Sequence, residues 1–282
     1  MVAEPVIESP LRRLRGSDLP DLLELLSEQP VHNLFLEYRV RAVSLDSPWF
    51  GGDVWGHYEG NRLVAACHAA TNVIPVGRFD DHLLESFALR VRRRPAASIV
   101  GDAHVVAALW QLLEPAWGPA RSLRMNQPLL AISGDPLVEP DTRVRAVLID
   151  EFDVVYPTCV AMFFEEVGTD PERGNRDGYR ARVAQIISQG WSFAIIEDER
   201  VLFKAEVGAV TPTACQVQGV YVAPEIRGEG LAAPALAAVV QQARERIAPT
   251  VSLYVNDHNI AARRAYARVG FEQVGTLATV LM

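Results

Sequence analysis

The sequence predicts an α/β protein in which one unit of strands and helices occurs twice along the chain. In each half, two apolar-rich runs joined by a short polar turn are followed by strand, turn, helix, strand and helix. Arg62 and Arg200 stand after equivalent hairpin turns. A turn-rich segment with two prolines, 133–143, separates the halves and indicates a boundary. We therefore expect domains at 1–135 and 141–282, although such an order also recurs by chance in unrelated folds.

The composition excludes several classes of function. The chain has 282 residues, of which 49% are hydrophobic, as in soluble globular proteins. Its net charge of −8 provides no basic field for nucleic acid. No apolar run reaches the length of a membrane span, and the first ten residues lack the pattern of a signal peptide. We expect a cytoplasmic protein that binds neither nucleic acid nor membrane.

Cysteine and lysine usage adds two expectations. Cys67, Cys159 and Cys215 are far apart and odd in number, so they make neither a disulfide framework nor a metal-ligand pattern. We therefore predict no metal site. Lys204 is the only lysine among 27 basic residues, and this preference for arginine indicates GC-rich coding of the actinobacterial type.

Each half has its own series of elements. Ser17 is suited to cap the first helix. The first half is predicted as helices 18–28 and 31–43, strands 53–58, 63–70 and 72–76, helix 80–91, strand 97–100, helix 103–113 and two strands within 121–132. The second half is predicted as strand 144–148, a partly helical segment 150–168, helix 179–188, strands 191–197, 201–209 and 217–222, a helix, strand 251–255, a helix and strand 277–281.

A glycine-rich turn follows strand 217–222. Gly228 and Gly230 stand two apart, and Pro234 suits the first turn of the helix that follows. Free N–H groups at a helix start converge on one point, the helix dipole adds positive charge there, and glycine lets a ligand come close. The turn predicts a phosphate or diphosphate site, unless it is an ordinary strand-to-helix connection. Neither GxxxxGK[ST] nor GxGxxG is present.

Two stretches together resemble the GNAT superfamily of acyl-CoA-dependent N-acyltransferases. Residues 220–232 are similar to its motif A, with V-x-V-x-P-E-x-R-G-x-G-L-A, and residues 259–271 to its motif B, with N-x-x-A-x-x-x-Y-x-x-x-G-F. The resemblance covers roughly the last half of the chain. It implies two GNAT-like domains, each a mixed, mostly antiparallel, splayed sheet flanked by helices. Glu225 departs from the family's Gln or Arg at that position, but main-chain contacts with the cofactor are expected to persist.

The resemblance implies acetyl-CoA as the co-substrate. Main-chain groups of Val220, Tyr221 and Val222 are expected to pair with the pantetheine amides like an added strand. Asn259 matches an asparagine that bonds the pantetheine chain, and its position also suits a helix cap. Arg263 either reaches a phosphate or is a solvated residue. Six consecutive main-chain amides are expected to cradle the diphosphate, those of Arg227, Gly228, Glu229, Gly230, Leu231 and Ala232.

Tyr266 is the predicted proton donor. It matches the motif B tyrosine near the thioester sulfur, and a phenol with a pKa of about 10 can protonate a departing thiolate. The alternative is a tyrosine that only packs beside Phe271. Aromatic residues of the first helices in the second half are expected either to contact substrate or to fill the core, and these are Phe152, Tyr156, Phe163 and Phe164.

The general base is less determined than the donor. Gln216 and Gln218 occupy places where related enzymes often carry a glutamate, and an amide cannot accept a proton. Glu206 is the best carboxylate, because strand alternation aims it at one face, although an exposed strand residue fits the same pattern. The Met282 carboxylate and ordered water are further candidates, and an amine of low pKa needs no base.

The first copy is predicted to be degenerate. Its turn contains a single glycine, Gly77, and the helix opens with Asp80 and Asp81. Their carboxylates are expected to occupy the N–H groups where a phosphate would bind, or to repel the phosphate. Trp110 stands where Tyr266 is expected in the second copy. The first half is therefore expected to serve as a scaffold or as one wall of a substrate cleft.

Three functions fit these features. The first is acetyl-CoA-dependent acetylation of a primary amine, on a small molecule or on a peptide or protein. The alternative is an acyl-CoA-binding regulatory module without turnover, because no base is obvious. An aminoacyl-tRNA-dependent transferase of related fold is disfavoured by the acidic charge. The sequence leaves the acceptor, the acyl chain length and the oligomeric state open.

Overall fold

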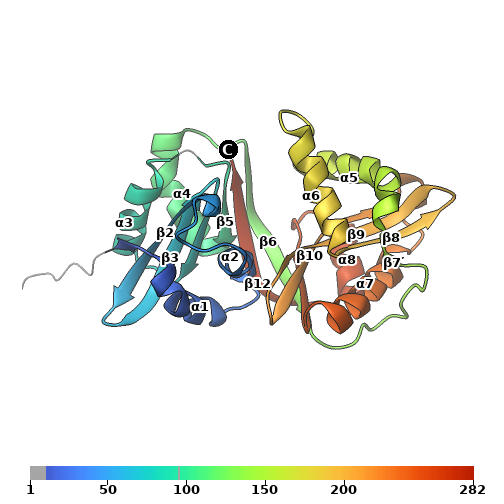
Figure 1. Ribbon diagram of the computed structural model, residues 1–282, viewed down its shortest axis with the longest axis horizontal. Helices are drawn as coiled ribbons and strands as arrows, with labels where there is room; N and C mark the ends of the chain where they lie inside the picture. Colours follow the sequence, from blue (N-terminus) through green and yellow to red (C-terminus); the bar gives the residue numbers. More distant parts are fainter. Residues whose placement is uncertain (1–10, 95) are drawn as a thin grey trace, which may run out of the picture. The chain divides into compact units, whose positions relative to one another are not determined.

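The computed structural model describes residues 11–94 and 96–282, and the prediction about the first ten residues lies outside them (Figure 1). The chain divides into two compact units. Unit 1 comprises Met1–Leu129 and Gly275–Met282, and unit 2 comprises Leu130–Val274. Among the described residues, no helix combines the length and the apolar character needed to cross a membrane.

Unit 1 is a sheet with helices on both faces. The described strands pair in the order β1-β2-β3-β4-β5-β12, and every pair is antiparallel except β4 with β5. Its elements are β1 (Arg12–Arg13), η1 (Gly16–Asp18), α1 (Leu19–Ser27), α2 (Leu34–Ala42), η2 (Pro48–Phe50), β2 (Gly52–Glu59), β3 (Arg62–Ala70), β4 (Asn72–Gly77), α3 (Asp81–Val91), β5 (Ser98–Asp102) and α4 (Ala103–Trp117), followed by β6 (Ser122–Ile132), whose last three residues belong to unit 2.

Two apolar clusters separate the faces of this sheet. Leu22, Leu25 and Leu26 of α1 are buried with residues of α2 against one face. Phe87 of α3 and Leu109 of α4 are buried against the other. The predicted Ser17 cap is wrong, because a short 3-10 turn precedes α1 and the Asp18 carboxylate accepts from the N–H of Arg15 at 2.7 Å.

Unit 2 repeats the arrangement. Its strands pair in the order β11-β10-β9-β8-β7, and only β10 and β11 among them are parallel. Its elements are β7 (Arg145–Ala146), η3 (Ile149–Glu151), α5 (Phe152–Val167), α6 (Arg176–Ser188), β8 (Ser192–Glu197), β9 (Arg200–Val210), β10 (Ala214–Val222), η4 (Pro224–Ile226), α7 (Ala232–Arg246), β11 (Thr250–Tyr254), α8 (Ile260–Val269) and the start of β12 (Glu272–Leu281).

Helices cover both faces of this sheet too. Phe203, Ala205 and Val207 of β9 are buried with α7 and α8 on one face, while α5 and α6 pack on the other (Figure 1). The alternate residues of β9, including Lys204 and Glu206, therefore face α5 and α6. Both units thus place two helices before three antiparallel strands, a helix, a parallel strand and a helix. The predicted fold class is confirmed.

The predicted course of three segments needs correction. Residues 122–132 form one strand, β6, rather than two. A proline lacks an N–H, but its fixed φ is tolerated in extended backbone at positions where no ladder hydrogen bond is needed. The C-terminal strand is counted with unit 1, not with 141–282. Its residues Leu277–Leu281 pair with β5, and Ala278 and Val280 are buried among side chains of α3 and α4. The expected strand 144–148 is reduced to the two residues of β7.

Candidate active site

The turn between β10 and α7 leaves main-chain donors open. Gly228 and Gly230 have φ angles of +87° and +89°, a conformation that favours glycine. A Cβ atom at either position would meet no other atom within 4 Å, so this side of the turn is open. Among the described residues, the N–H groups of Gly228, Glu229 and Gly230 donate to no protein acceptor. Donors of this kind at the start of a 15-residue helix can bind an anion.

Two details of the turn refine the sequence prediction. Pro234 lies in the first turn of α7, as expected. The N–H of Arg227, however, is directed to the carbonyl oxygen of Pro224 at 3.4 Å, a long hydrogen bond that makes it less available than the next three amides. Leu231 and Ala232 are half-buried at the helix start.

The sheet splays beside this turn. The recorded pairs of β10 and β11 are Ala214–Thr250, Cys215–Val251 and Gln216–Ser252, so their pairing ends before Val220 is reached. A β-bulge between Gln218 and Tyr221 bends β10 against β9, and Gly219 in it has a φ of +59°. Among the described residues, the main chain of 220–222 therefore has no strand partner on its β11 side, and we call this unpaired edge the slot.

Arg227 is tied to helix α5. Its guanidinium makes a two-pronged ion pair with Glu165, with both N–O distances at 2.8 Å, and its Nε donates to the carbonyl oxygen of Val222 at 3.0 Å. Glu165 raises the pKa of Arg227, and Arg227 lowers the pKa of Glu165. Glu225, the departure from the family pattern, is paired with Arg200. Sequence reasoning missed Glu165, because nothing local relates α5 to this turn.

Helix α8 carries the motif B residues. The Asn259 side chain accepts from the N–H of Ala262 at 3.1 Å, which confirms the capping role. Arg263 donates to the carbonyl oxygen of Asp257 at 3.2 Å. Tyr266 is 8% exposed, and its ring lies 6.1 Å from that of Phe271. For each residue the structural role does not exclude the functional one. Asn259 can cap α8 and also contact a ligand, and Tyr266 can pack beside Phe271 and also contact a ligand.

The Tyr266 hydroxyl is held protonated. Burial raises its pKa well above the usual value, and the negative charge of Glu166 adds to that effect. Within the described residues the hydroxyl makes no hydrogen bond. A protonated phenol without a protein partner can donate to a ligand on that side of α8.

Glu206 lies in a buried polar cluster. One carboxylate oxygen accepts from the Lys204 ammonium at 3.0 Å, and the other from the Gln218 amide at 2.9 Å. Burial opposes ionisation of Glu206, but Lys204, Gln218 and Arg182 outweigh it, so its pKa is lowered. Lys204 was not singled out as a site residue. The available signal was the single lysine of an arginine-rich chain, two residues before Glu206 on a mostly apolar strand.

The other candidate base belongs to unit 1. Met282 donates its N–H to the carbonyl oxygen of Ala97 and packs against an apolar cluster of that unit. Of these two candidate bases, Glu206 is the one that belongs to unit 2 and lies beside the β10 bulge.

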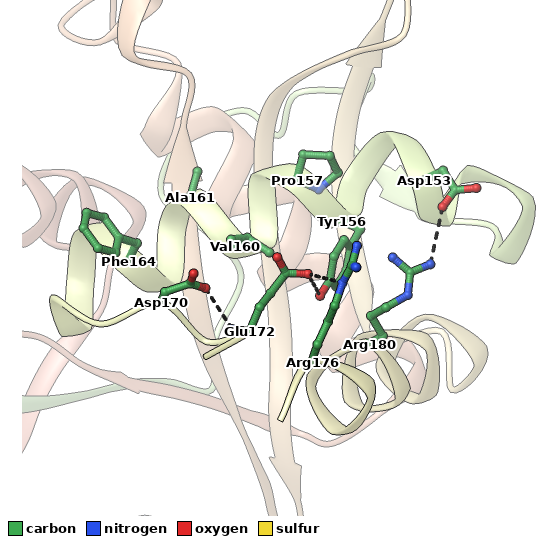
Figure 2. Close-up of a pocket in the computed structure, with 10 residues that line it drawn as sticks. All are labelled: Asp153, Tyr156, Pro157, Val160, Ala161, Phe164, Asp170, Glu172, Arg176 and Arg180. Carbon is green, nitrogen blue, oxygen red and sulfur yellow. Dashed lines mark hydrogen bonds and ion pairs between the residues drawn. The ribbon is translucent and has the colours of Figure 1, made fainter. Parts of the chain in front are cut away.

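A groove of about 640 Å³ lies between α5 and α6. Figure 2 shows Glu172 between Tyr156 and Arg176, with Tyr156 Oη at 2.9 Å and Arg176 Nε at 3.0 Å from the carboxylate. Phe164, 57% exposed, lines the groove, whereas Tyr156 is buried. Phe152 stacks on Tyr156, so of the predicted aromatic residues Phe164 offers the most accessible surface. No residue predicted for the cofactor lines this groove.

Comparison with known proteins agrees with this geometry. Residues 187–271 match the model of the acetyltransferase (GNAT) family, and residues 52–155 match a domain of unknown function (DUF4081). No curated protein sequence matches the chain. The open turn, the splayed strands and helix α8 all lie within the segment that matches this acetyltransferase family. Residues 187–271 are thus similar to the GNAT acetyltransferase family.

Solved structures share the fold over nearly the whole chain. A tandem GNAT protein from the clavulanic acid biosynthesis pathway is 16% identical, with a TM-score of 0.58 over 96% of this chain and 97% of its own. A GNAT-family acetyltransferase from Colwellia psychrerythraea is 14% identical, with a TM-score of 0.55 over 97% and 99%. A Drosophila protein is 14% identical, with a TM-score of 0.68 over 96% and 98%. At these identities the likeness concerns the fold.

Proposed function

We propose that this protein transfers an acetyl group from acetyl-CoA to a primary amine, with unit 2 as the catalytic unit. The observation that carries the proposal is the set of open amides at Gly228, Glu229 and Gly230 beside a splayed pair of strands. The amides suit the diphosphate of coenzyme A, and the slot along 220–222 suits its pantetheine arm. Both features belong to one stretch of chain, so one extended ligand can use them together.

Holding the thioester beside the amine supplies much of the catalysis, because it removes the entropy of bringing two reactants together. The diphosphate is placed at the start of α7, and the pantetheine arm runs back along β10 from Val222 towards Val220. The thioester then arrives near the bulge at Gly219. Asn259, already the cap of α8, is proposed to contact the pantetheine chain, and Arg263 is proposed to lie near a phosphate.

In the chemical step, the free amine attacks the thioester carbonyl carbon. The tetrahedral intermediate collapses, the C–S bond breaks, and the CoA thiolate takes a proton from the phenol of Tyr266. Its raised pKa keeps Tyr266 protonated at neutral pH. Before the attack, the acceptor's ammonium gives one proton to Glu206, directly or through water, because this carboxylate lies beside the bulge where the thioester is expected. After the attack, the nitrogen gives its second proton to the Tyr266 phenolate, which restores the phenol.

The acceptor is proposed to approach from the side of α5 and α6. The groove between these helices combines an exposed aromatic residue, Phe164, with three carboxylates, of which Asp153 and Glu172 are paired with lining arginines and Asp170 has no ion pair among the described residues. Such a lining suits an amine-bearing molecule or peptide with an apolar part. We propose a cytoplasmic setting, where acetyl-CoA is available.

The test is CoA release measured with acetyl-CoA and a panel of primary amines, which includes small metabolites, aminoglycosides, peptides with free N-termini and lysine peptides. At least one amine should be acetylated by the wild type, with turnover lowered in Tyr266→Phe. Acetyl-CoA alone should raise the melting temperature, because it binds only the folded state. Absence of that shift at saturating acetyl-CoA would remove the cofactor assignment.

A regulatory module that binds acyl-CoA without turnover is the second candidate. It is favoured by the ion pair of Glu206 with Lys204, since a carboxylate held ionised is a weak base. A melting shift with acetyl-CoA, combined with no CoA release for any amine in the panel, would select this function over the first.

A further inference from the structure

We propose that Lys204 is a positioning residue that holds the Glu206 carboxylate ionised and aimed at the acceptor amine beneath the bulge of β10. This proposal rests on the proposed function, in which Glu206 accepts the proton of the attacking amine. Lys204 itself touches neither substrate nor cofactor in this assignment. Its role is exerted through Glu206.

The pair is buried to a degree that is rare for charged groups. Lys204 is completely buried, and the Glu206 side chain is 11% exposed. A lysine in this position is costly unless its charge is matched, because removal of one partner from a buried pair leaves an uncompensated charge. Burial alone would lower the pKa of Lys204, but the attraction to Glu206, together with the contact to Cys159, outweighs it, so the pKa is raised. The two residues therefore form one ionised unit.

The pair lies directly under the bulge. A Cβ built on Gly219 would be 3.3 Å from the Lys204 Nζ, 3.5 Å from the Glu206 carboxyl carbon and 2.9 Å from the Met162 Cε. Any side chain at position 219 would thus displace these groups. Because the thioester end of the pantetheine arm is expected at this bulge, the carboxylate is next to the reacting centre.

The carboxylate is oriented by donors on both of its oxygens. Gln218, which lies on β10, donates to one oxygen. Lys204, which lies on β9 like Glu206 itself, donates to the other. Gly208 allows this arrangement, because a Cβ there would collide with the Gln218 side chain. These two donors hold the carboxylate in one orientation, and 11% of the Glu206 side chain remains exposed. That geometry suits capture of an ammonium group.

Other groups around the pair contribute less. Helix α5 presents Cys159, whose pKa is raised by burial, and helix α6 presents Tyr179 and Arg182. Cys159 and Tyr179 are neutral at pH 7, because burial raises both of their pKa values. Arg182 donates to the carbonyl oxygen of Gly208 at 3.1 Å and adds a second positive charge near Glu206. Lys204 is the charge in direct contact.

The sign of the effect follows from the contacts. Lys204 stabilises the ionised form of Glu206, so Glu206 stays ionised to lower pH than burial alone would allow. Without Lys204, burial is opposed only by Gln218 and Arg182, and the carboxylate takes up a proton at higher pH. The acid limb of the kcat/KM profile, which reports the ionised base, should therefore move to higher pH.

The chain's single lysine permits a direct test. Protein labelled with ¹³C-lysine has one lysine ε-methylene signal, which should titrate at acidic pH as Glu206 takes up a proton. In Glu206→Gln that inflection should vanish. A signal that titrates identically in wild type and Glu206→Gln would overturn the contact. This measurement needs no turnover, so it separates failure of the pair from failure of the proposed enzyme.

The kinetic arm uses Lys204→Met, with Lys204→Met/Glu206→Gln as the second variant in case the unpaired carboxylate prevents folding. The acid limb should move up by about one pH unit or more in Lys204→Met, and the double variant should fold and lack that limb. Arg182→Gln serves as a matched control with a smaller shift. Retained activity with an unmoved limb in Lys204→Met would overturn the positioning role, as would an acid limb retained by the double variant.

Discussion

The turn before α7 and the turn before α3 occupy equivalent places in the two units, but their main-chain donors differ. In unit 1 the Asp80 carboxylate accepts from the N–H of Leu83 at 2.7 Å and so occupies the helix start. In unit 2 the N–H groups of Gly228 and Gly230 have no acceptor among the described residues. A carboxylate cap satisfies donors that would otherwise bind a ligand and adds negative charge.

The two turns also differ in space. Gly77 in unit 1 has a φ of +94°, but a Cβ there would collide with the carbonyl oxygen of Val64. Gly228 and Gly230 have similar φ angles and open surroundings. Glycine in unit 1 thus permits close packing of two strands, whereas in unit 2 it opens a site. The same residue type thus allows close packing in one unit and an open turn in the other.

Gly228→Asp should make the turn of unit 2 resemble that of unit 1, and it should have the largest effect on CoA affinity. The aspartate places a carboxylate at the open donors, as in unit 1, and should weaken CoA binding by at least ~100-fold through charge and bulk. Calorimetric titration with CoA measures the change. Gly60→Asp is the matched control, because Gly60 has a φ of +59° and equally open surroundings in the β2–β3 turn. Unchanged affinity in Gly228→Asp would exclude this turn as the diphosphate site.

Two tyrosines extend the comparison. Tyr58 in unit 1 donates to Asp21 at 3.0 Å, whereas the Tyr266 hydroxyl makes no hydrogen bond within the described residues. Tyr266→Phe should lower turnover about 100-fold with stability nearly unchanged. Tyr58→Phe should cost about 1 kcal/mol of unfolding free energy with turnover unchanged. Turnover and denaturant unfolding of both variants check the pair, and equal turnover in wild type and Tyr266→Phe would remove the donor role.

Asp80→Ala should have a moderate effect confined to stability. Loss of the cap should lower the unfolding free energy by about 1 kcal/mol. Asp81→Ala, which removes an exposed carboxylate from the same helical turn, should cost less because it breaks no cap. Neither change should alter CoA affinity. A gain of a second CoA site in Asp80→Ala would show that the cap alone closes unit 1 to the cofactor.

Glu165→Gln should have the smallest effect. The Arg227–Glu165 pair is well exposed, so its loss should change stability by only about 0.5 kcal/mol or less. Removal of a negative charge beside the turn should raise CoA affinity about twofold at low salt, and the gain should fade as salt screens it. Glu225→Gln is the control, since Glu225 pairs with Arg200. A tenfold loss of affinity in Glu165→Gln would instead mean that this pair shapes the turn.

The predicted site residues fall into two groups. Gly228, Gly230, Pro234 and Asn259 were identifiable because their conformations depend on neighbours a few residues away, such as a positive φ, a first helical turn or a cap. The contacts of Glu206 were not, because a strand pattern indicates a face but not what covers it. The burial of Lys204 and its contact with the bulge at Gly219 depend on α5 and β10, which are distant in sequence.

The sequence by itself determined the repeated order of elements, the glycine-rich turn before α7 and the two motifs by which the second half resembles the GNAT family. Local backbone preferences and apolar periodicity decide these features. Only the tertiary structure decided that 122–132 is one strand, that Gly275–Met282 belongs to unit 1, and that Lys204 and Glu206 form a buried pair. Strand partners and the neutralisation of buried charge depend on packing between distant segments, which no local pattern specifies.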